Sequence, residues 1–385
     1  MQQTGGRRRT LIRLALMALI GATVFVAVPL SAHGASPTRP GPPTNVVATP
    51  VNTAIYTTWT APTDNGGSPI LYYVVSNVYN GSNDCVTPGP TTSCLSTGLT
   101  NGQSYTLRVR AVNAIGESTT VVLAPVTPNT TPNCNYIGPY ANLQNCWLVG
   151  KNFSGLNLTG ANLNGANVTY ATFTGANLTG VTMTGTIING ITSGGITGTP
   201  AALPSGFGVV NGYLIGPGNG VTNVSFAGVT FTPVNLAGAS MYGDNLSGTN
   251  LSAVTSFSGT NLSFDNFTNA NFTGINLTGA ILSGLTSGGI TGTPAALPTG
   301  WGVEGGYLIG PGNGVTNVSF AGVTFGPVDL TGAAMYGDDY TNADLSAVTS
   351  TSGAVFDYST WSNTVCPDGS NSSSYSPQTC IGHGI

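Results

Sequence analysis

The chain has 385 residues, which is enough for two or three domains of ordinary size. Only 5% of the residues are charged, whereas about a quarter are charged in a typical soluble protein, and 56 residues are glycine. This composition argues against nucleic-acid binding, coiled coils and charged disordered tails. Because 40% of the residues are apolar, low hydrophobicity gives no reason to expect disorder.

Residues 1–35 resemble a secretory signal peptide. An apolar stretch over 14–30 and small residues up to Ala35 follow a basic segment that contains Arg7, Arg8, Arg9 and Arg13. We therefore predict a secreted or cell-surface protein that has no membrane span after cleavage near Ala35. An uncleaved anchor is the alternative, because the apolar stretch approaches the roughly 20 residues that span a bilayer. The paired arginines fit a twin-arginine export signal as well as an ordinary one.

Removal of this segment leaves four basic residues against twelve acidic ones. No Lys or Arg follows Lys151, whereas nine acidic residues do: Asp244, Asp265, Glu304, Asp329, Asp338, Asp339, Asp344, Asp357 and Asp368. The C-terminal two thirds of the chain therefore cannot form a basic footprint, and we expect neither nucleic acid nor anionic lipid as a partner.

The six cysteines fall into three close pairs: Cys85 with Cys94, Cys134 with Cys146, and Cys366 with Cys380. An even number of cysteines in an exported chain favours disulfides, and nearest-neighbour pairing is the simplest of the possible connectivities. Each such bridge contributes on the order of 3 kcal/mol in the chain-entropy model. A zinc site is the alternative, but the CxxC spacing and a nearby histidine are missing. We predict structural disulfides, with no metal and no cofactor.

A Pro-rich linker over 36–43 and a second linker with an N-terminal cap over 129–140 enclose a first domain, 41–128. Its short alternating runs at 46–48, 55–59, 70–75 and 105–112 predict strands, and their number suggests a β-sandwich.

The details of this segment resemble a fibronectin type III domain. The resemblance rests on Trp59 followed by Ala61-Pro62, the turn from Asn65 to Ile70, and the run from Gly98 to Gly116 around Tyr105. It implies that Trp59 lies between two sheets, that Tyr105 is the corner tyrosine, and that the domain acts as a spacer or weak binding module. Cys85 and Cys94 would then pin a long hairpin between the middle strands.

From Ala141 the sequence repeats in blocks of five residues, such as Ala161-Asn162-Leu163-Asn164-Gly165. A period of five fits neither a helix nor a flat strand and requires a turn in every block. Four blocks then form one square coil of a parallel solenoid, in which the central residue and the small residue two before it point inward. The first ten centres are Leu143, Leu148, Phe153, Leu158, Leu163, Val168, Phe173, Leu178, Met183 and Ile188.

These blocks resemble the pentapeptide-repeat family, which implies a right-handed quadrilateral β-helix over 141–363. The predicted fold class is therefore all-β: a fibronectin type III-like sandwich plus a pentapeptide-repeat β-helix with two β-hairpin insertions. Residues 364–385 are predicted to form a disulfide-stapled cap and tail, because the ends of a solenoid must be protected from stacking.

The repeat is interrupted twice, near 191–223 and 285–317, within a duplication in which 193–256 matches 287–350. Asn211-Gly212 in the first copy and Gly305-Gly306 in the second predict type I′ hairpins, because glycine and asparagine adopt positive φ angles readily. We interpret these insertions as candidates for a ligand-facing surface.

Reactive groups are sparse. His383 is the one histidine after the signal segment, and a frayed tail would hold a catalytic base poorly. The neighbours Asp338 and Asp339 would point to opposite faces of a strand. We therefore predict that the protein is not an enzyme and has no catalytic residue.

The resulting hypothesis is a secreted, non-catalytic structural or binding protein, a rigid rod on a sandwich spacer. It would contact an extracellular protein, the cell wall or a glycan through Asn and Thr side chains and through Tyr213, Trp301, Tyr307 and Trp361. One alternative follows from pentapeptide-repeat relatives, an acidic DNA mimic that acts on a topoisomerase; another is a carbohydrate-binding accessory protein. Nine acids imitate DNA poorly, since DNA carries one charge per about 1.7 Å.

Overall fold

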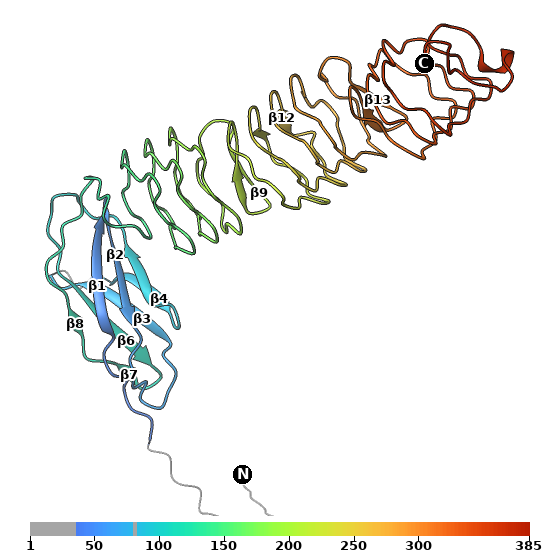
Figure 1. Ribbon diagram of the computed structural model, residues 1–385. Helices are drawn as coiled ribbons and strands as arrows, with labels where there is room; N and C mark the ends of the chain where they lie inside the picture. Colours follow the sequence, from blue (N-terminus) through green and yellow to red (C-terminus); the bar gives the residue numbers. More distant parts are fainter. Residues whose placement is uncertain (1–35, 80–82) are drawn as a thin grey trace, which may run out of the picture.

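The computed structural model describes residues 36–79 and 83–385, so the predicted signal segment lies outside the described residues. Figure 1 shows a β-sandwich at one end, followed by a long rod of stacked coils. The described residues form strands and short bridges, with one 3₁₀ turn, η1, at Ser372–Ser374. None of their helices is long and apolar enough to cross a membrane. The predicted all-β fold is confirmed.

The sandwich consists of two antiparallel sheets, whose strand orders are β1-β2-β5 and β4-β3-β6-β7, with β8 also paired to β6. The strands are β1 (Thr44–Val51), β2 (Ala54–Thr60), β3 (Tyr72–Asn77), β4 (Asn83–Pro88), β5 (Ser93–Ser96), β6 (Leu107–Asn113), β7 (Gly116–Glu117) and β8 (Val121–Val122).

Alternating side chains of the two sheets meet in the core of the sandwich. Trp59 is buried there, with its ring centroid 5.1 Å from that of Tyr73. The hydroxyl of Tyr105 accepts a 2.9 Å hydrogen bond from the backbone N–H of Thr100, five residues upstream. The predicted positions of Trp59 and of the corner tyrosine are confirmed.

The disulfide between Cys85 and Cys94 differs from the prediction in its location. Cys85 lies on β4, which pairs with β3, whereas Cys94 lies on β5, which pairs with β2. The bridge therefore joins the two sheets across the core and does not pin a hairpin. The sequence spacing of nine residues is compatible with both arrangements, because the chain between them crosses from one sheet to the other.

In the rod, each block pairs with the block one coil later through parallel backbone hydrogen bonds. The N–H of Leu163 donates to the carbonyl of Thr182 at 2.7 Å, and the N–H of Thr182 donates to the carbonyl of Ala161 at 3.0 Å. The corner between blocks needs a left-handed residue, such as Gly165 with φ 68°. Glycine adopts this conformation without the steric penalty of a Cβ atom.

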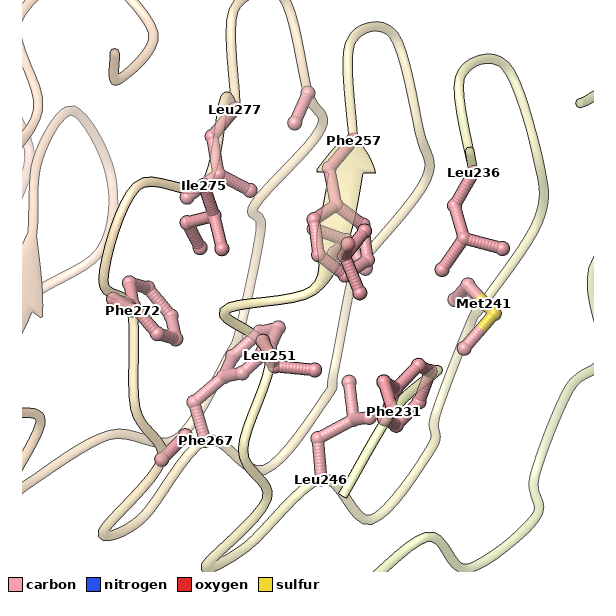
Figure 2. Packing of buried hydrophobic residues seen from close by; sticks show 14 of the residues in the cluster. Phe231, Leu236, Met241, Leu246, Leu251, Phe257, Phe267, Phe272, Ile275 and Leu277 are labelled. Carbon is pink, nitrogen blue, oxygen red and sulfur yellow. The ribbon is translucent and has the colours of Figure 1, made fainter. Parts of the chain in front are cut away.

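The centres of the blocks fill the axis of the rod. Leu163, Phe173 and Leu178 are completely buried, as the five-residue period predicts. Phe153 and Phe173, one coil apart, stack with ring centroids 4.7 Å apart. Figure 2 shows the same arrangement farther along, where apolar side chains from successive coils meet inside the coils. Burial of each such side chain contributes about 1.5–3 kcal/mol, so the core stabilises every coil.

The coil length changes from 20 to 21 residues in the middle of the rod. Asn250 pairs with Thr230, but Asn261 pairs with Ser240. The extra residue lies where β11 (Val234–Asn235) pairs in parallel with β12 (Val254–Ser256), because the register shifts within this pair. The one-residue slip in the sequence is thus absorbed by a local bulge.

Each insertion contains a two-stranded antiparallel hairpin: β9 (Gly208–Val210) with β10 (Tyr213–Ile215), and β13 (Gly302–Glu304) with β14 (Tyr307–Ile309). The turn residues Asn211 and Gly212 have φ angles of 47° and 78°, as the predicted type I′ turn requires. Leu214 and Ile215 are fully buried, as are their counterparts in the second hairpin. The hairpins therefore extend the core of the rod.

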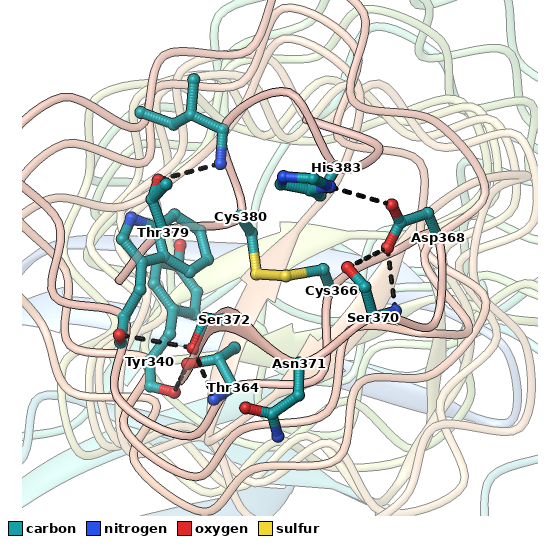
Figure 3. Close-up of a disulfide and its surroundings, with 12 residues drawn as sticks. Tyr340, Thr364, Cys366, Asp368, Ser370, Asn371, Ser372, Thr379, Cys380 and His383 are labelled. Atoms are coloured by element: carbon teal, nitrogen blue, oxygen red, sulfur yellow. Dashed lines mark hydrogen bonds and ion pairs between the residues drawn. A yellow bond between two sulfur atoms is a disulfide. The ribbon is translucent and has the colours of Figure 1, made fainter. Parts of the chain in front are cut away.

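Disulfides lie at both ends of the rod. Cys134 bonds with Cys146, whose side chain lies at an inward position of the first coil. Cys366 bonds with Cys380, and both are fully buried beneath the C-terminal loop (Figure 3). The expectation of a frayed tail is wrong, because His383 stacks on Tyr375 with ring centroids 3.7 Å apart.

Candidate interaction surface

The outward polar side chains of the rod mostly support its own turns. In the block around Leu158, Asn157 Oδ1 accepts hydrogen bonds from both the backbone N–H and the hydroxyl of Thr159, at 3.0 and 2.6 Å. Asn177 and Thr179 repeat this arrangement one coil later. Side chains of this kind accept hydrogen bonds from backbone N–H groups that would otherwise be unpaired at the turn. The stacked Asn and Thr side chains thus stabilise the turns of the rod. They also form a neutral surface that can make hydrogen bonds.

The four aromatic residues that the sequence suggested as contact groups are not free on the surface. Trp361 is 5% exposed and stacks on Tyr340, with ring centroids 4.5 Å apart. Tyr213 packs edge-on against buried Phe226, and Tyr307 packs in the same way in the second copy. Trp301 is partly buried against the core. The hairpin insertions that carry three of them fold into the rod.

A different set of aromatic residues is exposed, at the corners between blocks. Tyr170, Phe264 and Tyr358 are 70%, 59% and 83% exposed and have φ angles of 58° to 62°. This left-handed conformation costs a residue other than glycine roughly 1–2 kcal/mol. The ring of Tyr170 lies over Gly190 of the next coil, and that of Phe264 over Gly284. The five-residue register could have identified these positions, because each ring replaces the corner glycine of its block.

Three acidic side chains point into the rod at the position two before a centre, where most blocks have alanine. Asp244, Asp265 and Asp338 are at most 1% exposed. The Oδ1 atom of Asp244 accepts the N–H of Val224 at 2.9 Å, and that of Asp265 accepts the N–H of Asp244 at 2.8 Å. Within the described part of the chain, the Oδ2 atoms of Asp244 and Asp265 are buried without a hydrogen-bond partner.

The second copy of the duplication arranges this site differently. The Oδ2 atom of Asp338, the counterpart of Asp244, accepts a 3.3 Å hydrogen bond from the hydroxyl of Tyr340. Ser359 replaces Asp265, and its hydroxyl accepts the N–H of Asp338 at 3.2 Å. In this copy, a tyrosine hydroxyl bonds to Oδ2 of the inward aspartate and a serine hydroxyl accepts its N–H. In the first copy, the carboxyl group of Asp265 accepts that N–H, and Asp244 Oδ2 has no partner among the described residues.

Burial raises the pKa of all three carboxyl groups. The pKa reaches about 7 for Asp244 and about 6 for Asp338, and about 8 for Asp265, where the nearby Asp244 adds to the effect of burial. Burial also raises the pKa of Glu304, which is 7% exposed on β13. Removal from water disfavours the ionised form of an acid. Four of the nine acids on the rod therefore add little charge to its surface, and a substrate could not reach them.

Asp339 lies on the opposite face from Asp338, as predicted. It is half-buried, and the hydroxyl and N–H of Thr341 lower its pKa by hydrogen bonding to the ionised form. The adjacent carboxyl groups therefore do not form an acid pair.

The C-terminal cap brings a histidine, an aspartate and a serine together (Figure 3). His383 Nδ1 lies 3.3 Å from Asp368 Oδ2, and the hydroxyl of Ser370 donates to Asp368 Oδ1. A serine nucleophile needs its hydroxyl hydrogen-bonded to the imidazole, whereas Ser370 bonds to the carboxylate instead. No cluster of three or more potential metal ligands occurs among the residues that the structure describes. The contacts of this cluster fix the tail on the cap.

A pocket of about 370 Å³ lies between the sandwich and the first coils of the rod. The β1–β2 turn and the end of β5 contribute one wall, the linker contributes Thr130, and the coils contribute the other wall. The lining residues are uncharged: Val51, Asn52, Thr53, Ala54, Leu95, Thr97, Thr130, Tyr140, Asn142, Gln144, Gly160 and Asn162. This pocket could not be predicted from the sequence, because its two walls come from different domains.

Comparisons with known proteins agree with this architecture. The family model of the fibronectin type III domain matches residues 41–123, and that of pentapeptide repeats (eight copies) matches 140–169, 152–190 and 255–284. Endoglucanase B of Cellulomonas fimi is 34% identical over 140 residues, which cover 34% of this chain and 12% of that protein. The chain thus spans only a small part of this relative.

Solved structures resemble single parts of the chain. A human fibronectin type III domain is 27% identical, with a TM-score of 0.22, and covers 27% of this chain and 91% of its own. HetL is a pentapeptide repeat protein involved in heterocyst differentiation regulation in the cyanobacterium Nostoc sp. strain PCC 7120. It is 19% identical, with a TM-score of 0.20, over 60% of this chain and 91% of its own. The two family models by themselves show that the chain contains a fibronectin type III domain followed by pentapeptide repeats.

Proposed function

We propose that this protein is a secreted, non-catalytic rod that binds a neutral polymer or a protein outside the cell, with the sandwich domain as its spacer. The observation that carries the proposal is the division of side chains between the inside and the outside of the rod. Three of the nine acids, Asp244, Asp265 and Asp338, point inward, whereas the outward positions hold mainly amides, hydroxyls and the corner aromatics, with a few carboxylates such as Asp339 and Asp344. Such a surface suits neutral, hydroxyl-rich partners.

Two features support a location outside the cell. The three disulfides require an oxidising compartment to persist. The relative in Cellulomonas fimi is named as an endoglucanase, so part of this chain resembles part of a protein that acts on a polysaccharide. Its catalytic activity is not transferred by this resemblance, because the chain covers 12% of that protein.

The DNA-mimic alternative is weakened by the same division of side chains. A mimic must present its carboxylates on the surface at a density close to that of the phosphates, about one per 1.7 Å. Four acids are buried and cannot contribute to such a surface: Asp244, Asp265, Asp338 and Glu304. A supercoiling assay with a topoisomerase tests this alternative directly, and inhibition at low concentration would favour it.

Co-sedimentation tests the proposed function. The chain from residue 36 onward, with its disulfides formed, is mixed with isolated cell walls, several insoluble polysaccharides and intact cells, and the pellets are analysed. A folded, uncharged protein of similar size is the control for trapping. We expect enrichment in at least one pellet at physiological salt. Absence from every pellet, with the fold intact, would contradict a binding role.

Export is tested separately. The full chain and a variant that lacks residues 1–35 are expressed in the same bacterial host, and the medium, periplasm and cytoplasm are compared. We expect the full chain outside the cytoplasm in a shortened form. Equal distribution of the two proteins would contradict the proposed location.

A further inference from the structure

The junction between the two domains is fixed at several points. Within the linker, the carbonyl of Pro128 accepts the N–H of Gly102 at 2.9 Å, and the carbonyl of Thr130 accepts Nδ2 of Asn142 at 2.7 Å. Only Asn129 separates these two anchor points, one on each domain. Across the interface, the ring centroids of Tyr56 and Tyr140 lie 5.2 Å apart. The pocket at this junction is therefore held in shape by both domains.

Tyr140 supplies the aromatic wall of this pocket. It occupies a block corner with a φ of 58°, and its ring lies so close over Gly160 that an added Cβ there would be 2.6 Å from its Cδ1 atom. The contact with Tyr56 on one side and Gly160 on another fixes the ring. A rigid aromatic ring binds an apolar face with little loss of conformational entropy.

The rest of the lining supplies amides. Asn52 Oδ1 accepts Nδ2 of Asn101 at 2.8 Å, which leaves the Asn52 Nδ2 donor available. The side-chain amide of Gln144 is exposed and has no hydrogen bond within the described part of the chain. An amide offers both a donor and an acceptor. The pocket volume of about 370 Å³ falls in the range of roughly 300–1,000 Å³ that is common for ligand sites.

We propose that this junction is a binding site for a short neutral oligosaccharide, with Tyr140 as the stacking face and Asn52 and Gln144 as hydrogen-bonding groups. This inference rests on the proposed function and assigns its ligand class and site. Sugar rings have apolar C–H faces and hydroxyls that both donate and accept, which matches an aromatic ring flanked by amides. A charged ligand would find no ion-pairing group among the lining residues.

The chain offers a matched pair of variants for the test. Tyr140→Gly removes the ring and restores the residue that most corners carry, so the backbone conformation is retained. Tyr170→Gly makes the same change at a corner outside the pocket, with the same φ of 58°. Gln144→Ala is a second pocket variant that leaves the contact between Tyr56 and Tyr140 in place.

The measurement is isothermal titration calorimetry of the folded chain from residue 36 onward. The probes are cellohexaose, xylohexaose, laminarihexaose and mannohexaose, with hexagalacturonic acid as the charged comparison. We expect at least one neutral probe to bind, and Tyr140→Gly and Gln144→Ala each to weaken it about tenfold, the effect of losing about 1.4 kcal/mol. Tyr170→Gly should bind as the wild type does. Small-angle scattering checks that Tyr140→Gly keeps the angle between the domains.

The outcomes separate the site from the function. If no neutral probe binds, if only the charged probe binds, or if both pocket variants bind as tightly as the wild type, the proposed site is wrong. Sedimentation with insoluble polymers in any of these cases would leave the binding function intact and place it elsewhere. Absence of both sedimentation and oligosaccharide binding would remove the function and the site together.

Discussion

The two buried carboxyl groups in the middle of the rod should make its stability depend on pH. The perturbation is the double variant Asp244→Asn and Asp265→Asn. Asparagine retains the oxygen that accepts the N–H of Val224 in one case and of Asp244 in the other, but it cannot ionise. The variant therefore keeps the geometry of the protonated pair and removes its titration.

The sign of the effect follows from the raised pKa values. The folded chain holds these protons up to a pKa of about 7 at Asp244 and about 8 at Asp265, whereas the unfolded chain releases them near 3.8. The folded state thus binds more protons at intermediate pH, and the free energy of unfolding falls as pH rises. The fall is about 1.4 kcal/mol per pH unit for each group, or about 4 kcal/mol for Asp244 and about 6 kcal/mol for Asp265 by pH 9.

Hydrogen exchange measured by mass spectrometry on peptides over 240–270 reports the opening free energy of the coils that contain both residues. Rates are corrected for the intrinsic effect of pH. The wild type should lose protection from pH 5 to about pH 8 and change little above it, while the double variant should stay nearly constant and exceed the wild type at pH 9. Asp344→Asn is the control, because Asp344 faces outward and its hydrogen bonds to Ser346 lower its pKa.

Two results would refute this reasoning. Equal opening free energies of the wild type at pH 5 and pH 9 would show that the carboxyl groups do not titrate in this range. A pH dependence that persists in the double variant would assign it to other groups, with Asp338 the first to examine, since its pKa is about 6.

Three further predictions concern the fold. Phe173→Ala should lower the free energy of unfolding by about 3–5 kcal/mol in guanidinium titrations, because the ring is fully buried; a loss below 1 kcal/mol would contradict its packing role. Gly220→Ala should lower the melting temperature clearly, because its Cβ would collide with the carbonyl of Ser240; an unchanged melting temperature would mean that this backbone contact is absent. Joint replacement of Cys366 and Cys380 by alanine removes a bridge across 14 residues and should cost about 3 kcal/mol; limited proteolysis should then cut first in the C-terminal cap, and equal resistance of both proteins would contradict its stapling role.

Tyr340 shows that the repeat pattern predicts which side chains point inward, even where the residue is polar. Its place at a block centre predicts that it points inward, and it is fully buried. The same register places Asp338 inside, two residues earlier, although an aspartate alone would suggest the surface. The pattern of small and large residues therefore outweighs the polarity of an individual side chain, because one reversed residue would break the backbone hydrogen bonds of a whole coil.

The pocket and the inter-sheet disulfide could not be predicted in this way. Asn52 and Gln144 are 92 positions apart in the sequence and carry no shared pattern. Their proximity depends on the linker bonds at Pro128 and Thr130, and on the contact between Tyr56 and Tyr140. Similarly, the spacing of Cys85 and Cys94 does not reveal that the two strands lie in different sheets.

The amino-acid sequence by itself determined the sandwich, the square coil, the inward centres and the hairpin turns, because each depends on contacts within one block, one turn or one coil. Only the tertiary structure decided how far Tyr213, Trp301 and Tyr307 pack against the core, which acids lack a second hydrogen-bond partner, and what lies between the two domains. Those properties depend on how coils stack and how the sandwich meets the first of them, and the local five-residue period is the same whichever way those contacts are made.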